Sequence, residues 1–493
     1  MAVVDPLGYD ELPYPCSPYP QSQPEHLATL ACLMGLEFPP LAGARVLEIG
    51  CGDGANLLPL AFTMPGAELH GIDLAPRQIE AGLATVRALQ LHQVRLAVRD
   101  LRDLNDDDGA FDYIIAHGVY SWTPPDVRDA LLALIQKRLS PTGIGFISYN
   151  ALPGWSNRLA VREWLLTAVG ATRSGTERVA EARRLMHQLS ELLQSDTTQR
   201  SNALRTELAR LLEWSDGYLR HDLLEDHNQP VTFRQFNEHL NQHGLQFLAE
   251  ADFPTMVGQG LPSPIAQAVQ VRSSGAAERE QLFDVLTNRE FRQSLVIRAD
   301  RKVPRSIDPR VVERMYVGSP LKAASTEQGT TTFRAANGFA IAVNEPLLAA
   351  ALNYLAEVWP AWVNFDTLVE AGRSALSNQG QSLSEEKLAT RRTELATFLL
   401  GCFAERAVEL HVAAPPFSVV PSKRPTASPL ARRQALTSPL VTNLRHDLVR
   451  LSAAARELLP RLAEHGDSAE FARGTANYES AIREIARGAL LMR

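Results

Sequence analysis

The chain has 493 residues, of which 45% are hydrophobic and 21% charged, and its formal net charge is −7. A chain of this length exceeds one hydrophobic core, so we expect about three domains. The acidic balance excludes a general, non-specific nucleic-acid binder, and nucleic acid is therefore not an expected partner.

Cysteine usage and the first residues indicate a compartment. None of Cys16, Cys32, Cys51 and Cys402 stands at C-x-x-C spacing, so neither a disulfide framework nor a zinc site is expected, and thiols fit a reducing compartment. The start MAVVDPLGYDELPYP lacks the basic and apolar regions of a secretory signal, and no run is apolar enough to span a bilayer. We therefore predict a cytoplasmic protein with no membrane insertion.

Residues 1–25 are rich in proline and tyrosine. Repeated proline excludes a regular helix, and the alternative is a disordered tail. The aromatic content instead favours a segment that packs on the following domain through Tyr9, Tyr14 and Tyr19.

Residues 26–156 alternate between apolar strands and helices. The expected strands are RVLEIG (45–50), AELHGID (67–73), QVRLAV (93–98), FDYIIAHG (111–118) and GIGFISYN (143–150), with helices at 55–63, 76–90 and 125–139. This alternation predicts an α/β, Rossmann-like domain with a parallel sheet and helices on both faces.

The rest of the chain changes character. Residues 157–250 have helical periodicity without strands, and residues 254–330 mix Pro, Gly and Ser with helices. We therefore expect a helical middle domain over 157–325. In 326–493, Asn337-Gly338 predicts a hairpin within 331–344. Two helices and the strand VELHV (408–412) follow it, so we expect a winged-helix-like α+β region, then a loop over 413–443 and a helical end.

The strongest motif runs from Glu48 to Asn56, EIGCGDGAN, between a strand and a helix. Its glycines let the backbone bend and approach a ligand. Asp73 ends the next strand about 20 residues on, where ribose hydroxyls bind, and Asp100 ends the third strand, where a side chain meets an adenine amino group. NAD enzymes share the ribose acid but read G-x-G-x-x-G, and the third glycine is absent here.

These residues resemble a known family. VLEIGCGDGANLLPLA followed by GIDLAPRQIE is similar to motif I and the ribose-binding strand of class I methyltransferases. The resemblance implies S-adenosyl-L-methionine as cofactor, with the glycines beside its methionine part, Asp73 on the ribose and Asp100 with Leu101 on the adenine. The cofactor residues it implies are Glu48, Gly50, Cys51, Gly52, Asp53, Gly54, Asn56, Asp73, Leu74, Gln78, Asp100, Leu101, His117 and Gly118. A degenerate, non-binding scaffold is the alternative, but every acid and glycine that the site needs is present.

A closer resemblance covers residues 1–260. YDELPYPCSPYPQSQPEHLATLACLMGL, AHGVYSWTPP, SYNALPGW and the stretch 218–253 resemble bacterial methyltransferases that carry a methyltransferase regulatory domain. The rickettsial protein-lysine methyltransferases belong to that group. From residue 260 onward the likeness is one of architecture only. The resemblance implies protein-lysine N-methylation and a protein substrate.

An amine acceptor must be neutral when it attacks, and an apolar site favours that form. The loops after strands four and five open at the carboxyl edge of the sheet, where ligands bind in such folds. We expect Tyr120, Trp122, Tyr149 and Trp155 to wall an acceptor channel, although each could instead be ordinary packing. Asn150 would orient the nucleophile, Tyr14 would close the opening, and His117 is either a general base or, more often for such a residue, part of the cofactor shell or structural.

Two histidine clusters are weaker candidates. His239 and His243 stand four residues apart in HLNQH, but the sequence offers no glutamate at the H-E-x-x-H position and no third ligand, so we expect no metal. His221, Asp222, Glu225, Asp226 and His227 suit a cationic substrate, yet a solvated helix face is favoured.

Three functions compete. Protein-lysine methylation is favoured by the accessory region, because a macromolecular acceptor needs docking surface. Methylation of a small molecule or natural product is the alternative. The intact loops HGVYSW and SYN argue against a non-catalytic regulator that senses S-adenosylmethionine. A homodimer is left open. We expect a separately folding C-terminal half, so that a chain ending near residue 260 still binds cofactor.

Overall fold

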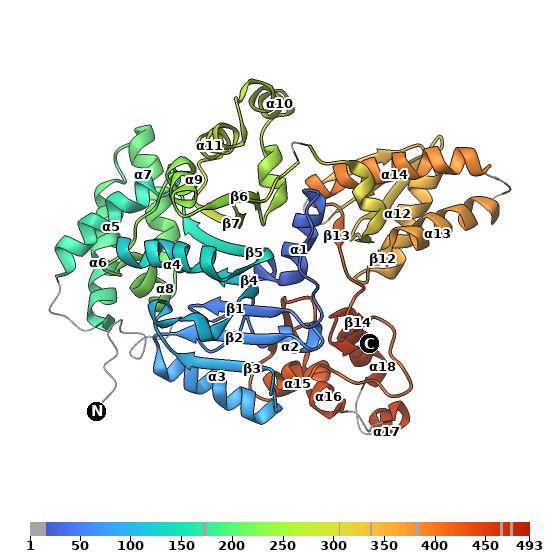
Figure 1. The fold of residues 1–493 in the computed structure, drawn as a ribbon, viewed down its shortest axis with the longest axis horizontal. Helices are drawn as coiled ribbons and strands as arrows, with labels where there is room; N and C mark the ends of the chain where they lie inside the picture. The colour runs from blue at the N-terminus through green and yellow to red at the C-terminus, as the bar shows by residue number, and fades with distance from the viewer. Residues whose placement is uncertain are drawn as a thin grey trace.

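The computed structural model describes residues 16–170, 175–304, 306–335, 338–378, 380, 384–463, 467–473 and 477–493. Tyr9 and Tyr14 of the N-terminal segment and Asn337 of the expected hairpin turn lie outside the described residues. Figure 1 shows a central sheet with helices on both sides and a C-terminal part that extends from one end.

A seven-stranded sheet in the order β3-β2-β1-β4-β5-β7-β6 forms the centre of the molecule. Its strands are β1 (Arg45–Ile49), β2 (Glu68–Asp73), β3 (Val94–Val98), β4 (Phe111–Ala116), β5 (Leu139–Asn150), β6 (Leu245–Glu250) and β7 (Phe291–Arg298). Strands β1 to β5 are parallel, and β7 is antiparallel to both of its neighbours. The five predicted strands and the Rossmann-like fold class are therefore confirmed.

Two hydrophobic clusters cover the two faces of this sheet. On one face, α4 (Pro125–Arg138) and α9 (Phe233–Gln242) pack against β1, β4 and β5. On the other face, α1 (Pro24–Leu33) and α3 (Pro76–Leu89) belong to a cluster that continues without a break into the C-terminal region. Proline in the first turn of α1, α3 and α4 suits these helix starts, because its missing N–H has no helical partner there.

Four helices with a core of their own follow the last parallel strand. They are α5 (Ser156–Val169), α6 (Gly175–Leu192), α7 (Gln199–Leu212) and the short α8 (Asp216–Tyr218), and a π-helical turn, η5 (Leu219–Leu223), continues α8. Figure 1 shows this group beside the carboxyl ends of the parallel strands. The helices thus stand at the edge where the glycine motif lies.

The middle region also returns two strands to the sheet, which corrects the expectation of a region without strands. LQFLAE forms β6 and FRQSLVIR forms β7, separated by α10 (Ser263–Arg272) and α11 (Ala276–Thr287). Both segments are short and partly polar, so their periodicity does not distinguish them from the surrounding helices. A chain ending near residue 260 lacks β7, which pairs with β5 and with β6. It is therefore not expected to keep the cofactor site intact.

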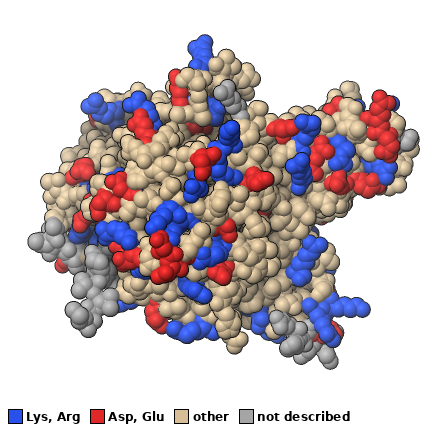
Figure 2. All heavy atoms as spheres, in the orientation of Figure 1, with Lys and Arg blue, Asp and Glu red and all other residues tan. Residues whose placement is uncertain are grey.

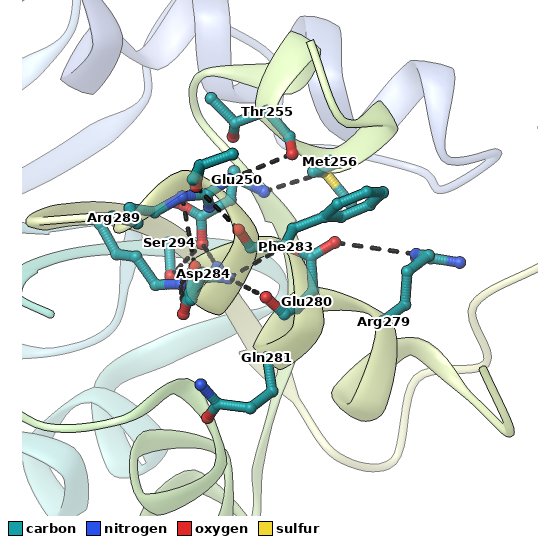
Figure 3. A network of polar contacts seen from close by, with 12 residues as sticks. Glu250, Thr255, Met256, Arg279, Glu280, Gln281, Phe283, Asp284, Arg289 and Ser294 are labelled. Carbon is teal, nitrogen blue, oxygen red and sulfur yellow. Dashed lines mark hydrogen bonds and ion pairs between the residues drawn. The ribbon is translucent and has the colours of Figure 1, made fainter. Parts of the chain in front are cut away.

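A buried ionic network fixes these two strands to α11. The Arg292 guanidinium lies 2.6 Å from Glu250, 2.8 Å from Asp284 and 3.2 Å from Glu280, and all four side chains are buried. Figure 3 shows the three carboxylates, from β6 and α11, meeting at one place. The ring of Phe233 packs 4.3 Å from the guanidinium carbon. Such an arrangement offsets the cost of burying charge only while every partner is present.

The C-terminal region comprises a helical lobe and a smaller group of helices, both visible in Figure 1. The lobe contains β8 (Tyr316–Gly318), β9 (Lys322–Glu327), β10 (Thr330–Arg334), β11 (Ala340–Val343), α12 (Pro346–Val358), β12 (Val363–Asn364), α13 (Phe365–Asn378), α14 (Glu385–Ala404) and β13 (Glu409–His411). The second group contains β14 (Phe417–Ser418), α15 (Pro429–Ala435), β15 (Leu440–Thr442), β16 (Leu448–Arg450), α16 (Ala453–Leu458), α17 (Ser468–Arg473), α18 (Tyr478–Arg487) and β17 (Leu491–Met492).

This region confirms one sequence prediction and corrects another. β10 and β11 pair antiparallel, as the expected hairpin requires. The segment 413–443, expected to be a loop, contains helix α15. Ser428 caps that helix by accepting from the Ala431 N–H, and Pro429 occupies its first position. No helix in the described part of the chain is long and apolar enough to cross a membrane.

Candidate active site

The turn after β1 requires its glycines. Gly50, Gly52 and Gly54 have φ values of 74°, 55° and 79°, a region that other residues rarely adopt. A Cβ on Gly50 would lie 2.9 Å from Val119 Cγ2, and one on Gly52 would lie 2.7 Å from the side chain of Gln78. The motif therefore forms a tight turn on which other segments pack closely.

Two acids stand at the ends of the following strands. Asp73, the last residue of β2, accepts hydrogen bonds from the Gly52 and Ala75 N–H groups, each 2.8 Å long, and burial raises the pKa of its carboxyl. Asp100 follows β3 and accepts from the Arg102 guanidinium at 2.7 Å, a hydrogen bond that lowers the pKa of Asp100. A carboxylate has about four acceptor positions, so both acids keep capacity for a further donor.

The remaining expected cofactor residues surround this turn. Leu74 is 45% exposed although it is apolar, whereas Leu101 and Cys51 are buried. Asp53 accepts from the Ala55 N–H at 3.0 Å, and the Gly118 N–H donates to Ser148 Oγ at 2.8 Å.

A buried pair, Glu48 and Asn56, lies behind the glycines. Glu48 Oε1 accepts from Asn56 Nδ2 at 2.8 Å, while Oε2 is buried without a hydrogen-bond partner among the described residues. Burial raises the pKa of Glu48 to about 8. Asn56 Oδ1 accepts from the Tyr19 N–H at 2.7 Å and lies 2.8 Å from His446 Nε2, which is 390 residues away in sequence.

The described part of the N-terminal segment lies over the turn. Cys16 Sγ is 3.6 Å from Gln78 Oε1, and the Tyr19 ring packs on His117 with centroids 3.8 Å apart and the ring planes tilted by 34°. Burial lowers the pKa of His117 to about 4, so its imidazole is neutral and a weak base. Its Nδ1 has no hydrogen-bond partner within the described chain. This placement favours the cofactor shell over general base catalysis for His117.

Three segments meet at Asn150. Its N–H donates to Ser121 Oγ, its Nδ2 donates to Asn228 Oδ1 at 3.1 Å, and its carbonyl accepts from the Val231 N–H. The loop after β4, the end of β5 and residues of the middle region therefore converge where the sequence predicts an acceptor site. Trp122 and Trp155 lie beside this junction, with ring centroids 6.2 Å apart.

Tyr120 and Tyr149 lie elsewhere than expected. Both are at most 2% exposed, and both pack on Phe236 of α9 instead of lining an opening. The Tyr120 hydroxyl lies 2.8 Å from His239 Nδ1. Successive side chains of a strand point to opposite faces, so Tyr149 enters the core below α9 when Asn150 faces the junction.

Asp222, which the sequence offered only as part of a weaker candidate cluster, and Phe291, which the sequence did not single out, lie near this end of the sheet. Asp222 stands in the π-helical turn η5, a geometry that often occurs at functional sites. Burial raises the pKa of Asp222 to about 7, and its charge acts on the Tyr19 hydroxyl. Phe291 begins β7, is 41% exposed, and meets the His117 ring edge to face at 6.0 Å. The acidic-histidine run 221–227 was the available signal, but its charges suggested a solvated helix.

Known proteins resemble the chain over most of its length. Family models match as a methyltransferase domain over 47–144, a "Predicted methyltransferase regulatory domain" over 215–298 and a "PKMT, C-terminal winged helix domain" over 423–476. Two Rickettsia prowazekii proteins, RP789 and RP028, are 36% and 37% identical over 64% and 49% of the chain. The matches cover 57% of RP789 and 97% of RP028.

A solved structure resembles this protein over nearly the full length of the chain. PKMT2 from Rickettsia typhi, also solved in complex with AdoHcy, matches 97% of this chain and 100% of its own with a TM-score of 0.84 and 26% identity. The chain belongs to the S-adenosylmethionine-dependent methyltransferases that carry a methyltransferase regulatory domain. S-adenosyl-L-methionine is accordingly the cofactor of this methyltransferase.

The residues of the methyltransferase's glycine turn fit that cofactor. The amino group and sulfonium of the cofactor are cationic, and three acids lie at or next to the turn: Asp53 within it, Asp73 at the end of β2 and Glu48 buried behind it. Glu48 Oε2 has no hydrogen-bond partner among the described residues. Asp73, at the carboxyl end of β2, is the group that would hold ribose hydroxyls.

The winged helix domain of the methyltransferase lies closer to the C-terminus than we expected from the sequence. It matches at 423–476, whereas the expected helix-helix-strand unit ends at residue 412. Within it, β15 and β16 form a hairpin, and His446 stands in the connection with φ 68°. This hairpin, residues 440–450, is called the wing below. The contact between His446 and Asn56 thus joins the wing to the cofactor motif.

Proposed function

We propose that the protein N-methylates lysine side chains of a protein acceptor. The observation that carries this proposal is the match to PKMT2 across the regulatory and winged helix domains as well as the methyltransferase domain. A small-molecule methyltransferase needs no such match outside its catalytic domain.

The chemistry of an amine acceptor supports the same proposal. S-adenosylmethionine supplies the methyl group, and a lysine ammonium must lose a proton before its nitrogen can attack. Asp222, with a pKa of about 7, is charged for part of the time at neutral pH and can both attract the ammonium and accept its proton. Tyr19, on whose hydroxyl the Asp222 charge acts, and Phe291 supply aromatic surface around His117, and partial desolvation there favours the neutral amine.

The test follows the label from S-adenosylmethionine into proteins and small molecules of a cell extract, and then into lysine by hydrolysis of the labelled protein. We expect label in protein, as methylated lysine. Label in small molecules alone would support the alternative substrate class, and no label anywhere would support a cofactor-sensing regulator. Either outcome contradicts the proposal.

A variant pair tests the role of Asp222. Asp222→Asn keeps the shape of the side chain but cannot accept the proton, so single-turnover methylation should fall about tenfold or more while AdoHcy affinity stays unchanged. The rise of kcat/KM with pH through about 7 should disappear in the variant. Asp226→Asn is the matched control, because Asp226 is an exposed carboxylate of the same segment. Equal loss in both variants would exclude a specific role for Asp222.

A cytoplasmic location and a homodimer remain part of the proposal. All four cysteines lie within the described residues as thiols, which supports a reducing compartment. On the face shown in Figure 2, basic and acidic side chains alternate without a broad basic area, in keeping with an acceptor other than nucleic acid.

A further inference from the structure

Helices α4 and α9 bring three potential metal ligands together on the surface. Asp129 of α4, His239 of α9 and His243, the C-cap residue directly after α9, each offer a ligand atom, and these atoms all lie within 4.8 Å of one another. Both histidines aim Nε2 at the same carboxylate oxygen, at distances of 2.8 Å and 3.9 Å from Asp129 Oδ1. His239 lies in the last turn of α9 and His243 caps that helix four residues later, so both side chains lie on the same side of the helix end.

The spacing suits a tetrahedral ion. Bonds of about 2.0–2.1 Å to a tetrahedral Zn²⁺ place neighbouring donor atoms about 3.3 Å apart, between the two observed distances. Small rotations of the Asp129 carboxylate, which is 63% exposed, equalise them. The histidines are 18% and 22% exposed, so water can reach the fourth coordination position.

A buried tyrosine orients one of the three ligands, His239. His239 Nδ1 lies 2.8 Å from the hydroxyl of Tyr120, whose side chain is buried in the core. This contact holds the ring so that Nε2 faces Asp129. Histidine ligands of metals are typically held in this way, through a hydrogen bond at the second ring nitrogen.

We propose that Asp129, His239 and His243 bind one divalent transition-metal ion of the Zn²⁺ type, with water completing its coordination. Two imidazoles and one carboxylate suit Zn²⁺, Co²⁺ or Ni²⁺ and do not suit Mg²⁺ or Ca²⁺, which prefer oxygen ligands. The sequence showed the two histidines but not the third ligand, because Asp129 lies 110 residues before His239.

An ion at this position would be bound by residues of two domains. Asp129 belongs to the methyltransferase domain and both histidines to the regulatory domain. Tyr120 stands in the loop that continues from His117 at the cofactor edge. A bound ion therefore joins the two domains and fixes the contact between α9 and the active-site loop.

The experiment uses the full chain without a polyhistidine tag, treated with a chelator and then dialysed. Calorimetric titration with Zn²⁺ should show one site, and Zn²⁺ should raise the melting temperature. His243→Ala and Asp129→Asn should each weaken binding at least about tenfold and remove the thermal shift. His187→Ala, which removes an exposed histidine from α6, is the matched control and should bind as the parent chain does.

A further variant separates the proposed site from metal capture elsewhere on the surface. Tyr120→Phe keeps all three ligands but removes the hydroxyl, so affinity should fall about tenfold to a hundredfold with one site retained. Unchanged Zn²⁺ affinity in both His243→Ala and Asp129→Asn would overturn the proposal. Absence of saturable binding by the parent chain would overturn it as well.

Discussion

The contact between His446 and Asn56 predicts that the wing helps to form the cofactor site. The Tyr19 N–H can only donate, so the oxygen of the Asn56 amide must face it, and His446 must donate its Nε2–H to the same oxygen. The Asn56 nitrogen then faces Glu48. In His446→Ala the oxygen loses one of its two shortest hydrogen bonds and keeps those from Tyr19 and, at 3.3 Å, from Ser22 Oγ. The turn also loses this buried contact with the C-terminal domain.

The size of the effect follows from one buried hydrogen bond. Its loss costs about 1–2 kcal/mol, since His446 is 1% exposed and water does not readily replace the imidazole. If the lost free energy destabilises the conformation of the turn that binds the cofactor, the affinity for AdoHcy drops by about 5- to 30-fold. His446→Gln retains an N–H donor on a flexible chain and should recover part of the loss.

Isothermal calorimetry with AdoHcy measures this directly, alongside circular dichroism to verify that each variant is folded. Arg450→Ala is the matched control, because Arg450 is exposed on the same hairpin. AdoHcy affinity equal to that of the parent chain in a folded His446→Ala variant would refute the reasoning. The contact would then hold the wing in place without affecting the turn.

Three further results are expected. Asp73→Ala should weaken AdoHcy binding about tenfold to a hundredfold by calorimetry, and unchanged affinity would exclude the ribose assignment. Arg292→Ala removes the cation that three buried carboxylates share, leaving Asp284 with Arg289 and Glu280 with Arg279, and should lower the free energy of unfolding in urea by about 3–5 kcal/mol, whereas a loss below about 1 kcal/mol would show that the network contributes little. Burial alone would lower the pKa of His411, but Glu25 and Glu409 raise it from 6.5 to about 9. The stability that the charged imidazole contributes is therefore fully present below pH 6.5 and is lost as the pH rises through 9. The melting temperature should therefore fall over that interval, and Glu25→Gln should reduce this dependence; an identical pH profile in the variant would contradict the assignment.

Local signals in the sequence were sufficient for the parallel half of the sheet and for the cofactor turn. Apolar runs of six to eight residues identify β1 to β5, and a glycine motif after the first of them has few structural alternatives. Asp73 could be located because its distance from the motif is set by one helix and one strand.

Long-range features could not be predicted in the same way. The contact between Asn56 and His446 leaves no local trace, because each residue is compatible with an ordinary turn. The burial of Asp222 depends on helices α5 to α7, which cover the edge of the sheet and whose placement no periodicity specifies. Tyr120 and Tyr149 are aromatic in an expected acceptor loop, yet the core below α9 provides a larger apolar contact than a channel wall would.

The Asn56 amide couples parts of the chain that the sequence suggests are independent. Its oxygen accepts from the N-terminal segment and from the wing, and its nitrogen donates to the acid of the cofactor motif. Any ligand that orders the turn must therefore stabilise the wing contact by the same free energy with which the wing favours the ligand, because binding linkage is reciprocal. A protein acceptor that contacts the winged helix domain would then change cofactor affinity without touching the cofactor. The C-terminal domain consequently belongs to the energetics of the active site.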